Sequence, residues 1–155
     1  MTYSLDHRSG QHIDLLGDRY RLLATGDQTG GSIAVVEVTV GPGGGVPPHV
    51  DNNEAIGWYV LEGSLVFMVE GEERTLDAGG WIYSPKGVLH TFRNASGKSA
   101  RALLLALPAG LDGFFREAGR ALGPEDDPRP PTESEIAAAM AAAPLYGLDF
   151  PAPSP

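Results

Sequence analysis

Between residues 19 and 107 the chain alternates short runs rich in Val, Ile, Leu, Tyr and Phe with clusters of Gly, Pro, Asn and Asp. Such runs are typical of β-strands, and the clusters between them are typical of turns. No helical run separates one strand from the next, as βαβ units would require, so the pattern predicts an all-β fold, a sandwich or barrel. The expected strands span residues 19–24, 32–40, 56–61, 65–69, 81–84, 89–92 and 101–107.

Helical signals are confined to the last third of the chain. Apolar residues recur at helical spacing from Leu111 to Leu122, with Asp112 as the expected N-cap and Gly123 as the expected stop. A second helix is expected over the alanine-rich residues 136–143, because Thr132 and Glu135 are spaced as a capping box and Pro144 ends the run. The acidic, proline-rich residues 124–132 between them predict an extended connector.

Length and composition limit the possible functions. At 155 residues one domain is expected, divided into an N-terminal arm at 1–18, a barrel at 19–108, and C-terminal helices and tail at 109–155 that pack on the barrel or a partner subunit. A formal charge of -9 argues against binding to nucleic acid or anionic membranes. The polar start lacks the order of a secretion signal, so a cytoplasmic protein is expected. The absence of cysteine excludes thiolate chemistry, so any metal must be held by imidazole and carboxylate.

One group of residues at fixed spacing carries a specific signal: Gly79, Pro85, Gly87, His90 and Asn94. The glycines permit tight turns, the proline fixes the direction of the chain, and the histidine follows on the returning strand. Five fixed residues at four fixed spacings rarely coincide by chance. The group matches the second cupin motif at every fixed position.

The first cupin motif is present in altered form. Gly43, His49 and Gly63 are in place, but Asp51 stands where the motif has its second histidine, and Ile56 stands where it has a glutamate. Across nearly the whole chain the sequence resembles the bacterial single-domain cupins related to quercetin 2,3-dioxygenase. The resemblance implies a double-stranded β-helix, or jelly-roll barrel, that is usually a homodimer. It also implies an Fe, Ni, Mn or similar ion held by three His and one Glu, of which only His49 and His90 carry over.

The candidate site is made of His49, Asp51 and His90. Alternate residues of a strand share a face, so His49 and Asp51 point the same way, and cupin geometry implies that His90 reaches them from a neighbouring strand. Two imidazoles and a carboxylate are the donors of 2-His-1-carboxylate centres, so one Fe, Ni, Mn or Zn ion is one interpretation. The other is a lost metal site, because Asp is shorter than His and Ile56 removes a carboxylate. Glu54 is expected at the rim, as a weaker candidate ligand.

The pocket walls are predicted to be apolar. Ile56, Trp58 and Val60 share one strand face, and Phe92 shares that of His90. Such a pocket suits a small apolar or polyphenolic, polyketide-like metabolite better than a sugar or phosphate.

Three functions remain open from the sequence. In the first, His49, Asp51 and His90 are catalytic in an acid–base cyclisation, isomerisation or elimination, as in secondary metabolism. In the second, the same residues hold the metal of a quercetinase-like dioxygenase. In the third, the chain is a non-catalytic metabolite-binding cupin. The expected partners are a small apolar metabolite and a second copy of the chain.

Overall fold

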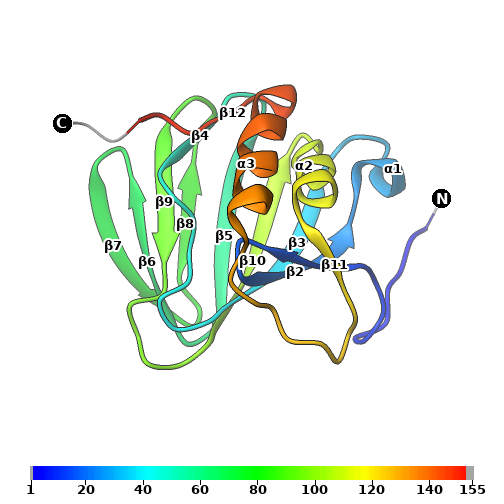
Figure 1. Ribbon diagram of the computed structural model, residues 1–155, viewed down its shortest axis with the longest axis horizontal. Helices are drawn as coiled ribbons and strands as arrows, with labels where there is room; N and C mark the ends of the chain where they lie inside the picture. The colour runs from blue at the N-terminus through cyan, green and yellow to red at the C-terminus, as the bar shows by residue number, and fades with distance from the viewer. Residues whose placement is uncertain (1, 153–155) are drawn as a thin grey trace.

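The structure is a computed structural model that describes residues 2–152, and it consists of two antiparallel sheets facing each other (Figure 1). The larger sheet has the order β11 (Arg120–Leu122), β1 (His12–Leu15), β2 (Asp18–Ala24), β3 (Ala34–Val40), β10 (Ala100–Leu107), β5 (Ala55–Glu62) and β8 (Trp81–Ser84). The smaller sheet has the order β12 (Leu148–Asp149), β4 (His49–Asp51), β9 (Leu89–Arg93), β6 (Ser64–Val69) and β7 (Glu72–Asp77). The all-β expectation is confirmed.

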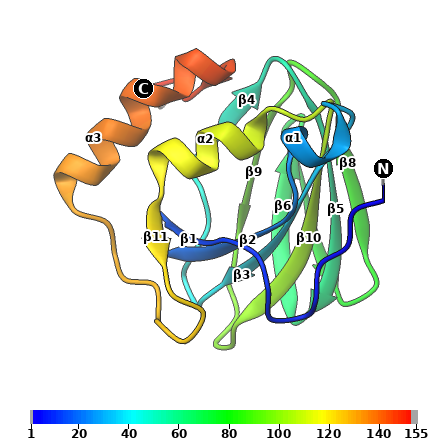
Figure 2. The same cartoon turned by 90° about the vertical axis from the view of Figure 1, so that its right-hand side faces the viewer.

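Helices lie at one end of the barrel (Figure 2). They are α1 (Gly26–Thr29), α2 (Leu111–Ala118), α3 (Glu133–Ala142) and the 3-10 helix η1 (Ala143–Tyr146). Helix α2 packs against β1 and β3, and α3 packs on α2. Within residues 2–152 no helix has both the length and the apolar character needed to cross a membrane.

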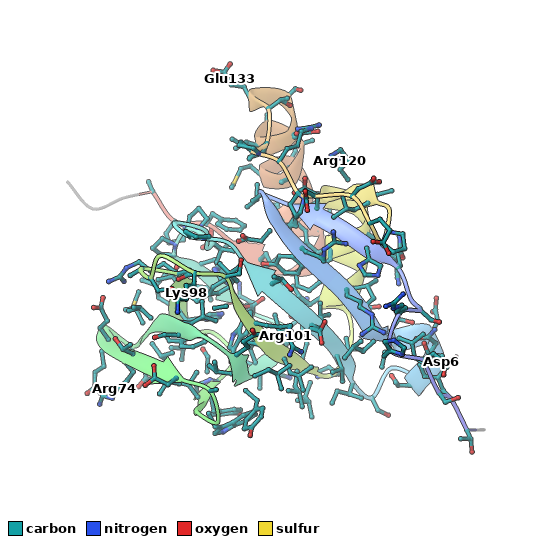
Figure 3. The ribbon with its side chains drawn as sticks, turned by 90° about the horizontal axis from the view of Figure 1, so that it is seen from below. Asp6, Arg74, Lys98, Arg101, Arg120 and Glu133 are labelled. Carbon is teal, nitrogen blue, oxygen red and sulfur yellow. The ribbon has the colours of Figure 1, made fainter. Side chains whose placement is uncertain are left out.

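The core fills the space between the sheets, as the view from below shows (Figure 3). On each central strand the buried side chains alternate with partly exposed ones, because successive residues of a strand point to opposite faces. The fully buried members of the core include Val36, Val38, Val40, Ile56, Val60, Leu65, Ala102 and Ala106. Since fully burying one Val, Leu or Ile side chain contributes about 1.5–3 kcal/mol, these inward rows supply most of the driving force for closing the barrel.

The predicted strands are all present, with bounds shifted by at most two residues. Strands β1, β4, β7, β11 and β12 were not in the predicted set. In β7 nearly every residue is exposed, so no apolar alternation marks the strand. The others are four residues long or shorter and obtain their backbone partners from distant parts of the chain, as β11 does from β1 and β12 from β4.

The prediction for the first C-terminal helix was wrong at both ends. The N-cap is Gly110, and the carboxylate of Asp112 instead accepts hydrogen bonds from the backbone N–H groups of Gly110 and Gly26, at 3.0 and 3.1 Å. The helix ends at Ala118, and Gly119 is its C-cap in an extended conformation. Ile13 of β1 lies so close to Gly119 that any side chain at position 119 would overlap it. Residues 120–122 then pair with β1 as strand β11.

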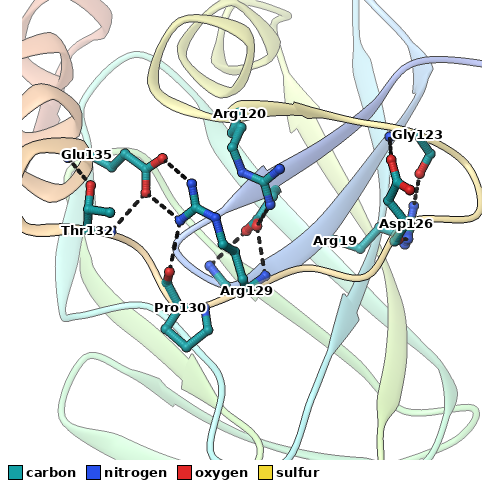
Figure 4. Close-up of polar contacts among 10 residues, drawn as sticks. Arg19, Arg120, Gly123, Asp126, Arg129, Pro130, Thr132 and Glu135 are labelled. Carbon is teal, nitrogen blue, oxygen red and sulfur yellow. Dashed lines mark hydrogen bonds and ion pairs between the residues drawn. The ribbon is translucent and has the colours of Figure 1, made fainter.

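The second helix agrees with its capping box. The Thr132 hydroxyl accepts from the Glu135 N–H at 3.2 Å, and the Glu135 carboxylate accepts from the Thr132 N–H at 2.8 Å. The connector before it is fixed to the barrel (Figure 4). The Arg129 backbone N–H donates to the Asp14 carboxylate at 2.9 Å, and the Arg120 guanidinium binds the same carboxylate at 2.6 Å. Ion pairs and hydrogen bonds thus hold this proline-rich segment against β1.

The motif residue Asn94 has a structural role between β9 and β10. It is 1% exposed, and its amide donates to the carbonyls of Val40 and Lys98 at 2.9 and 2.7 Å. Its side-chain oxygen accepts from the backbone N–H and hydroxyl of Ser96 at 2.9 and 2.7 Å. The one side chain therefore satisfies polar groups from both sides of the turn.

We predict that Asn94→Ala lowers the free energy of unfolding by about 2–4 kcal/mol, because it leaves buried backbone groups such as the Val40 carbonyl unpaired. Urea denaturation measures the change. Ser96→Ala is the matched control, since it keeps both bonds donated by Asn94 and should cost about 1 kcal/mol or less. Equal losses in the two variants would contradict this role for Asn94.

Candidate functional site

Strands β4 and β9 bring the two candidate histidines together. The strands are antiparallel neighbours with His49 directly opposite His90, and the ring centroids lie 4.3 Å apart. Asp51, two residues after His49, is on the same face of β4. One donor atom from each of the three residues lies within 4.8 Å of the other two. The cluster inferred from the sequence is therefore present as a unit.

The carboxylate of Asp51 faces both imidazoles. Its Oδ2 lies 2.9 Å from His90 Nε2 and 3.4 Å from His49 Nε2, and its side chain is 1% exposed. Neither distance comes with a well-directed hydrogen bond, and both carboxylate oxygens lack a hydrogen-bond partner within residues 2–152. The nitrogens therefore converge on the space beside the carboxylate rather than pointing along a line to it.

The far sides of the rings fix their tautomers. His49 Nδ1 lies 3.0 Å from the Pro47 carbonyl, and His90 Nδ1 lies 3.0 Å from the Val88 carbonyl and 3.1 Å from the Ser84 hydroxyl. A carbonyl oxygen only accepts hydrogen bonds, so each Nδ1 must carry the proton. In the neutral rings both Nε2 lone pairs then face an anionic carboxylate, which is a repulsive arrangement. A positive charge among them, either a proton on Nε2 or a metal ion, removes the repulsion.

Asp51 is ionised at neutral pH. Burial by itself would raise the pKa of Asp51, but the close contacts of its carboxylate with the His49 and His90 rings, and the positive charge that these rings carry when protonated, outweigh burial and lower the pKa to about 2. Two imidazole nitrogens and one ionised, otherwise unpartnered carboxylate form a donor set that fits a divalent transition metal. The same set also fits a protonated imidazole held next to its counter-ion.

Glu54 is not part of this cluster. It is 2% exposed, and its Oε1 lies 2.8 Å from the point that a Cβ on Gly110 would occupy, so the side chain is directed to the start of α2. Its Oε2 has no hydrogen-bond partner in the described part of the chain. Burial, followed by the charge of Asp51, raises the pKa of Glu54 to about 7. Glu54 is buried, whereas the sequence predicted an exposed rim position.

An apolar cavity adjoins the cluster. Its wall includes His49 and Asp51 but not His90, and apart from Tyr20 its other members are apolar: Leu15, Leu16, Val46, Ile56, Trp58, Phe92, Leu104, Leu111, Phe114, Phe115 and Leu148. Of the four predicted pocket residues, Ile56, Trp58 and Phe92 line this cavity. Val60 does not, because it lies further along β5 and is enclosed in the core with 0% exposure.

Apart from Tyr20 of β2 and Leu104 of β10, the residues that the sequence did not assign to the cavity come from outside the central strands. Phe114 and Phe115 belong to the apolar stripe of α2, whose spacing was visible in the sequence although its destination was not. Tyr20 adds a hydroxyl to the wall. Burial first, and then the negative charges of Asp18 and Asp51, raise the pKa of this hydroxyl, so Tyr20 remains a neutral hydrogen-bond donor.

Residues 146–150, here called the C-terminal strap, cover the cavity mouth. Leu148 and Asp149 pair with β4, and the side chains of Asn52 and Asn53 donate to strap carbonyls at 3.0 and 3.2 Å. The Phe150 ring lies 5.5 Å from that of His49. The cavity has a volume of only about 40 Å³. That space holds a few waters or an ion, and a larger guest requires the strap to shift.

Comparison with known proteins agrees with this architecture. Residues 36–106 match the family model described as the cupin domain. The chain contains a cupin domain. It is 27% identical over 120 residues to quercetin 2,3-dioxygenase of Bacillus subtilis, an alignment that covers 77% of this chain and 35% of that relative. The chain therefore spans about a third of the length of that protein.

Solved structures share the cupin fold. The polyketide cyclase RemF from Streptomyces resistomycificus superposes with a TM-score of 0.60 and 24% identity, covering 69% of this chain and 80% of RemF. KdgF from Halomonas superposes with a TM-score of 0.61 and 20% identity, covering 73% of this chain and 98% of KdgF. At these identities the likeness is one of fold. The chemistry of this cupin must be argued from its own residues.

The buried carboxyl groups give the cupin barrel a pH-dependent stability. Burial also raises the pKa of Asp18 from 3.8 to about 7, so Glu54 and Asp18 are both stabilised in their neutral forms. A folded-state pKa above the unfolded value gives stability that is full below the unfolded pKa and is lost as the pH rises through the folded pKa. For Glu54 that window runs from about pH 4.5 to pH 7.

We therefore predict that the free energy of unfolding of metal-free protein falls between pH 5 and pH 8, and that Glu54→Gln removes up to about 3 kcal/mol of this fall. Urea denaturation at the two pH values measures it. Glu125→Gln removes an exposed carboxylate from the connector and serves as the control, with the fall expected to remain as in the unaltered chain. A fall of the same size in Glu54→Gln would show that Glu54 does not cause it.

Proposed function

We propose that this cupin is an enzyme that moves protons on a small, apolar, oxygen-bearing metabolite, catalysing a cyclisation, isomerisation or elimination. One observation carries the proposal: two imidazoles of fixed tautomer face an ionised, otherwise unpartnered Asp51 beside an apolar cavity. Imidazole gains and loses protons near neutral pH, and a counter-ion on one side sets which nitrogen does so. The apolar wall favours a polyketide-like or polyphenolic guest.

The two histidines have different roles in this proposal. His49 lines the cavity, so its Nε2 accepts a proton from an acidic C–H or O–H of the substrate and returns it at another atom. His90 is outside the lining but lies 2.9 Å from Asp51, so it positions the carboxylate. Asp51 stabilises the His49 imidazolium that forms on proton transfer. In a cyclisation or isomerisation the proton returns to the same substrate at another atom. In an elimination it joins the leaving hydroxide and departs as water.

Tyr20 is the proposed electrophilic partner. Removing a proton next to a carbonyl or phenol places negative charge on the substrate oxygen, and a neutral hydroxyl in a water-poor cavity stabilises that charge. The raised pKa of Tyr20 keeps its hydroxyl protonated throughout. The substrate would thus lie between Tyr20 and His49.

A metal-dependent dioxygenase is the second candidate. The convergence of two Nε2 atoms and an orphaned carboxylate fits an Fe, Ni or Mn ion held by His49, Asp51 and His90, and similarity to the Bacillus subtilis dioxygenase supports it. A bound ion would supply Lewis-acid and oxygen chemistry. The residues of this chain would hold its ligands in register through the Nδ1 hydrogen bonds of both imidazoles and exclude water with the apolar wall.

We predict that His49→Ala reduces turnover by about 10²-fold or more, the usual contribution of a general base. The assay incubates the full chain with panels of flavonols and linear polyketide analogues and records product mass. Unchanged mass, or loss of water, with EDTA-treated protein supports acid–base catalysis. Gain of two oxygen atoms, restored by Fe, Ni or Mn, supports the dioxygenase. His12→Ala, outside the cluster, is the control. Full activity in His49→Ala would reject both candidates.

We predict that Tyr20→Phe lowers kcat by about 10²-fold with a smaller change in KM, because the hydroxyl acts on charge that develops in the transition state. Steady-state kinetics on the substrate found in that assay separates the two constants. Tyr3→Phe removes a hydroxyl from an exposed tyrosine and should have no effect. An increase in KM alone would assign Tyr20 to substrate binding instead.

A further inference from the structure

A surface cleft lies outside the apolar cavity, between the end of α2, the connector and α3. It has a volume of about 320 Å³, and we call it the outer cleft. Its apolar wall includes Leu16, Ala118, Pro131 and Ala138, and its charged groups are those of Asp14, Glu117, Arg120, Arg129 and Glu135. The outer cleft is far larger than the cavity of about 40 Å³ beside His49.

One side chain separates the outer cleft from the cavity. Leu16 lines both spaces, and no other residue among 2–152 lines both. Leu16 belongs to the turn between β1 and β2, and its partly buried side chain packs against the core. The two spaces therefore meet at the Leu16 side chain.

The backbone at Leu16 is strained. Leu15 pairs with Asp18, so the turn consists of Leu16 and Gly17, whose φ angles are 53° and 93°. Two positive φ angles in a two-residue hairpin are characteristic of a type I′ turn, which favours the pair Asn-Gly. A leucine in the left-handed region is disfavoured by contact of its Cβ with the backbone. Strain of this kind persists where a residue has a function, and here it points to the side chain.

A second turn of the same kind shows what the backbone alone requires. Glu70 and Gly71 join β6 to β7 with φ angles of 55° and 78°. Glu70 is polar and exposed, and it lines neither the cavity nor the outer cleft. At Leu16 the same turn geometry instead presents an apolar side chain to the core. The turn therefore does not require the leucine, whose side chain closes the cavity.

The Leu16 side chain has space to move into. Besides the cavity and the outer cleft, it borders a further cleft of about 250 Å³, which lies beside residues 41–44 and 128–131. A change of rotamer at a turn residue leaves both sheets in place, because only the side chain rotates. Rotation of this one side chain toward solvent would join the cavity to the outer cleft.

We propose that the outer cleft is the second half of the substrate site and that Leu16 is the gate between the two halves. The inference rests on the proposed function, and it narrows the substrate to a linear molecule with an apolar body and an oxygen-bearing far end. Sites for such molecules have volumes of about 300–1,000 Å³, which the cavity reaches only together with the outer cleft. The reacting atoms lie between Tyr20 and His49, and the rest of the molecule passes Leu16.

The charges of the outer cleft favour a neutral far end. Its two guanidinium groups are already paired, Arg120 with Asp14 at 2.6 Å and Arg129 with Glu135 at 2.8 Å (Figure 4). With Glu117 the cleft holds three carboxylates against two cations, so a phosphate or sulfate would be repelled. A hydroxyl can donate to these carboxylates, and a carbonyl can accept from the guanidinium N–H groups. The far end is therefore a hydroxyl or a carbonyl.

Acrylamide quenching of Trp58 fluorescence tests the gate without a substrate. Trp58 lines the cavity at 4% exposure, and Trp81→Phe removes the other tryptophan of the full chain. In that background Leu16→Gly should raise the quenching constant by about threefold or more, because the wall is removed and glycine suits the positive φ. Leu16→Asn, which creates the favoured Asn-Gly pair, should act in the same direction.

Glu70→Gly is the matched control for the gate, since it relieves the same strain in the other turn and should leave the quenching constant unchanged. Circular dichroism checks the fold of each variant. Unchanged quenching in both folded Leu16 variants would overturn the gate. Loss of the fold in both would also overturn it, because Leu16 would then be a packing residue.

Calorimetric binding of curcumin, a linear polyphenolic β-diketone, tests the outer half of the site. Ala138→Phe should weaken binding to the full chain by about tenfold or more, because the new ring fills the outer cleft. Ala137→Phe is the matched control, since Ala137 is the exposed neighbour on α3 that does not line the cleft. Equal binding to the two variants, or no binding to the unaltered chain, would overturn this half.

The two measurements are independent of catalysis. Neither quenching nor curcumin binding requires turnover, so a chain that shows both effects but converts no compound in the product-mass assay would contradict only the proposed function. Turnover without either effect would contradict the gate and the outer cleft, and would leave the proposed function intact.

Discussion

The chemistry of the site depends on the pairing of β4 with β9. This register places His49 opposite His90, and the alternation along β4 adds Asp51 to the same face. Backbone carbonyls then hold the Nδ1 proton of each ring, so both Nε2 lone pairs must face the carboxylate. The fold holds three electron-pair donors close together in a buried place, where they repel one another. A positive charge between them would stabilise the arrangement. A proton on one Nε2 atom or a bound metal ion would each supply that positive charge.

The residues around the cluster determine how strongly its charges interact. Apolar walls from the barrel and from α2 leave few polar groups near Asp51, and the C-terminal strap limits the entry of water. In such a medium charges interact more strongly than in water, so one bound cation changes the ionisation of the whole cluster. The strap is held by its two pairs with β4, by the side chains of Asn52 and Asn53, and by the hydrogen bond from the Tyr146 hydroxyl to Glu117.

Local patterns in the sequence sufficed for seven of the strands, because period-two alternation is a property of neighbouring residues. The meeting of His90 with His49 and Asp51 was expected from the resemblance to the cupin motifs. These local patterns did not predict how far along the barrel a side chain lies. Alternation correctly places Val60 on the same strand face as Trp58. It does not show that Val60 lies further along the barrel, in the core and away from the cavity. Contacts between distant segments were equally hidden: residues 120–122 pair with β1 instead of continuing α2, and Leu148 reaches the cavity because β12 pairs with β4.

The two departures from the first cupin motif compensate each other. Ile56 removes the carboxylate of the motif and now lines the cavity, whereas Asp51 introduces a carboxylate where the motif has an imidazole. The number of anionic donors is therefore unchanged, and only one neutral donor is lost. The charge available to a cation is preserved while the wall around it becomes less polar. Relative to the motif, the two changes together move the carboxylate from position 56 to position 51.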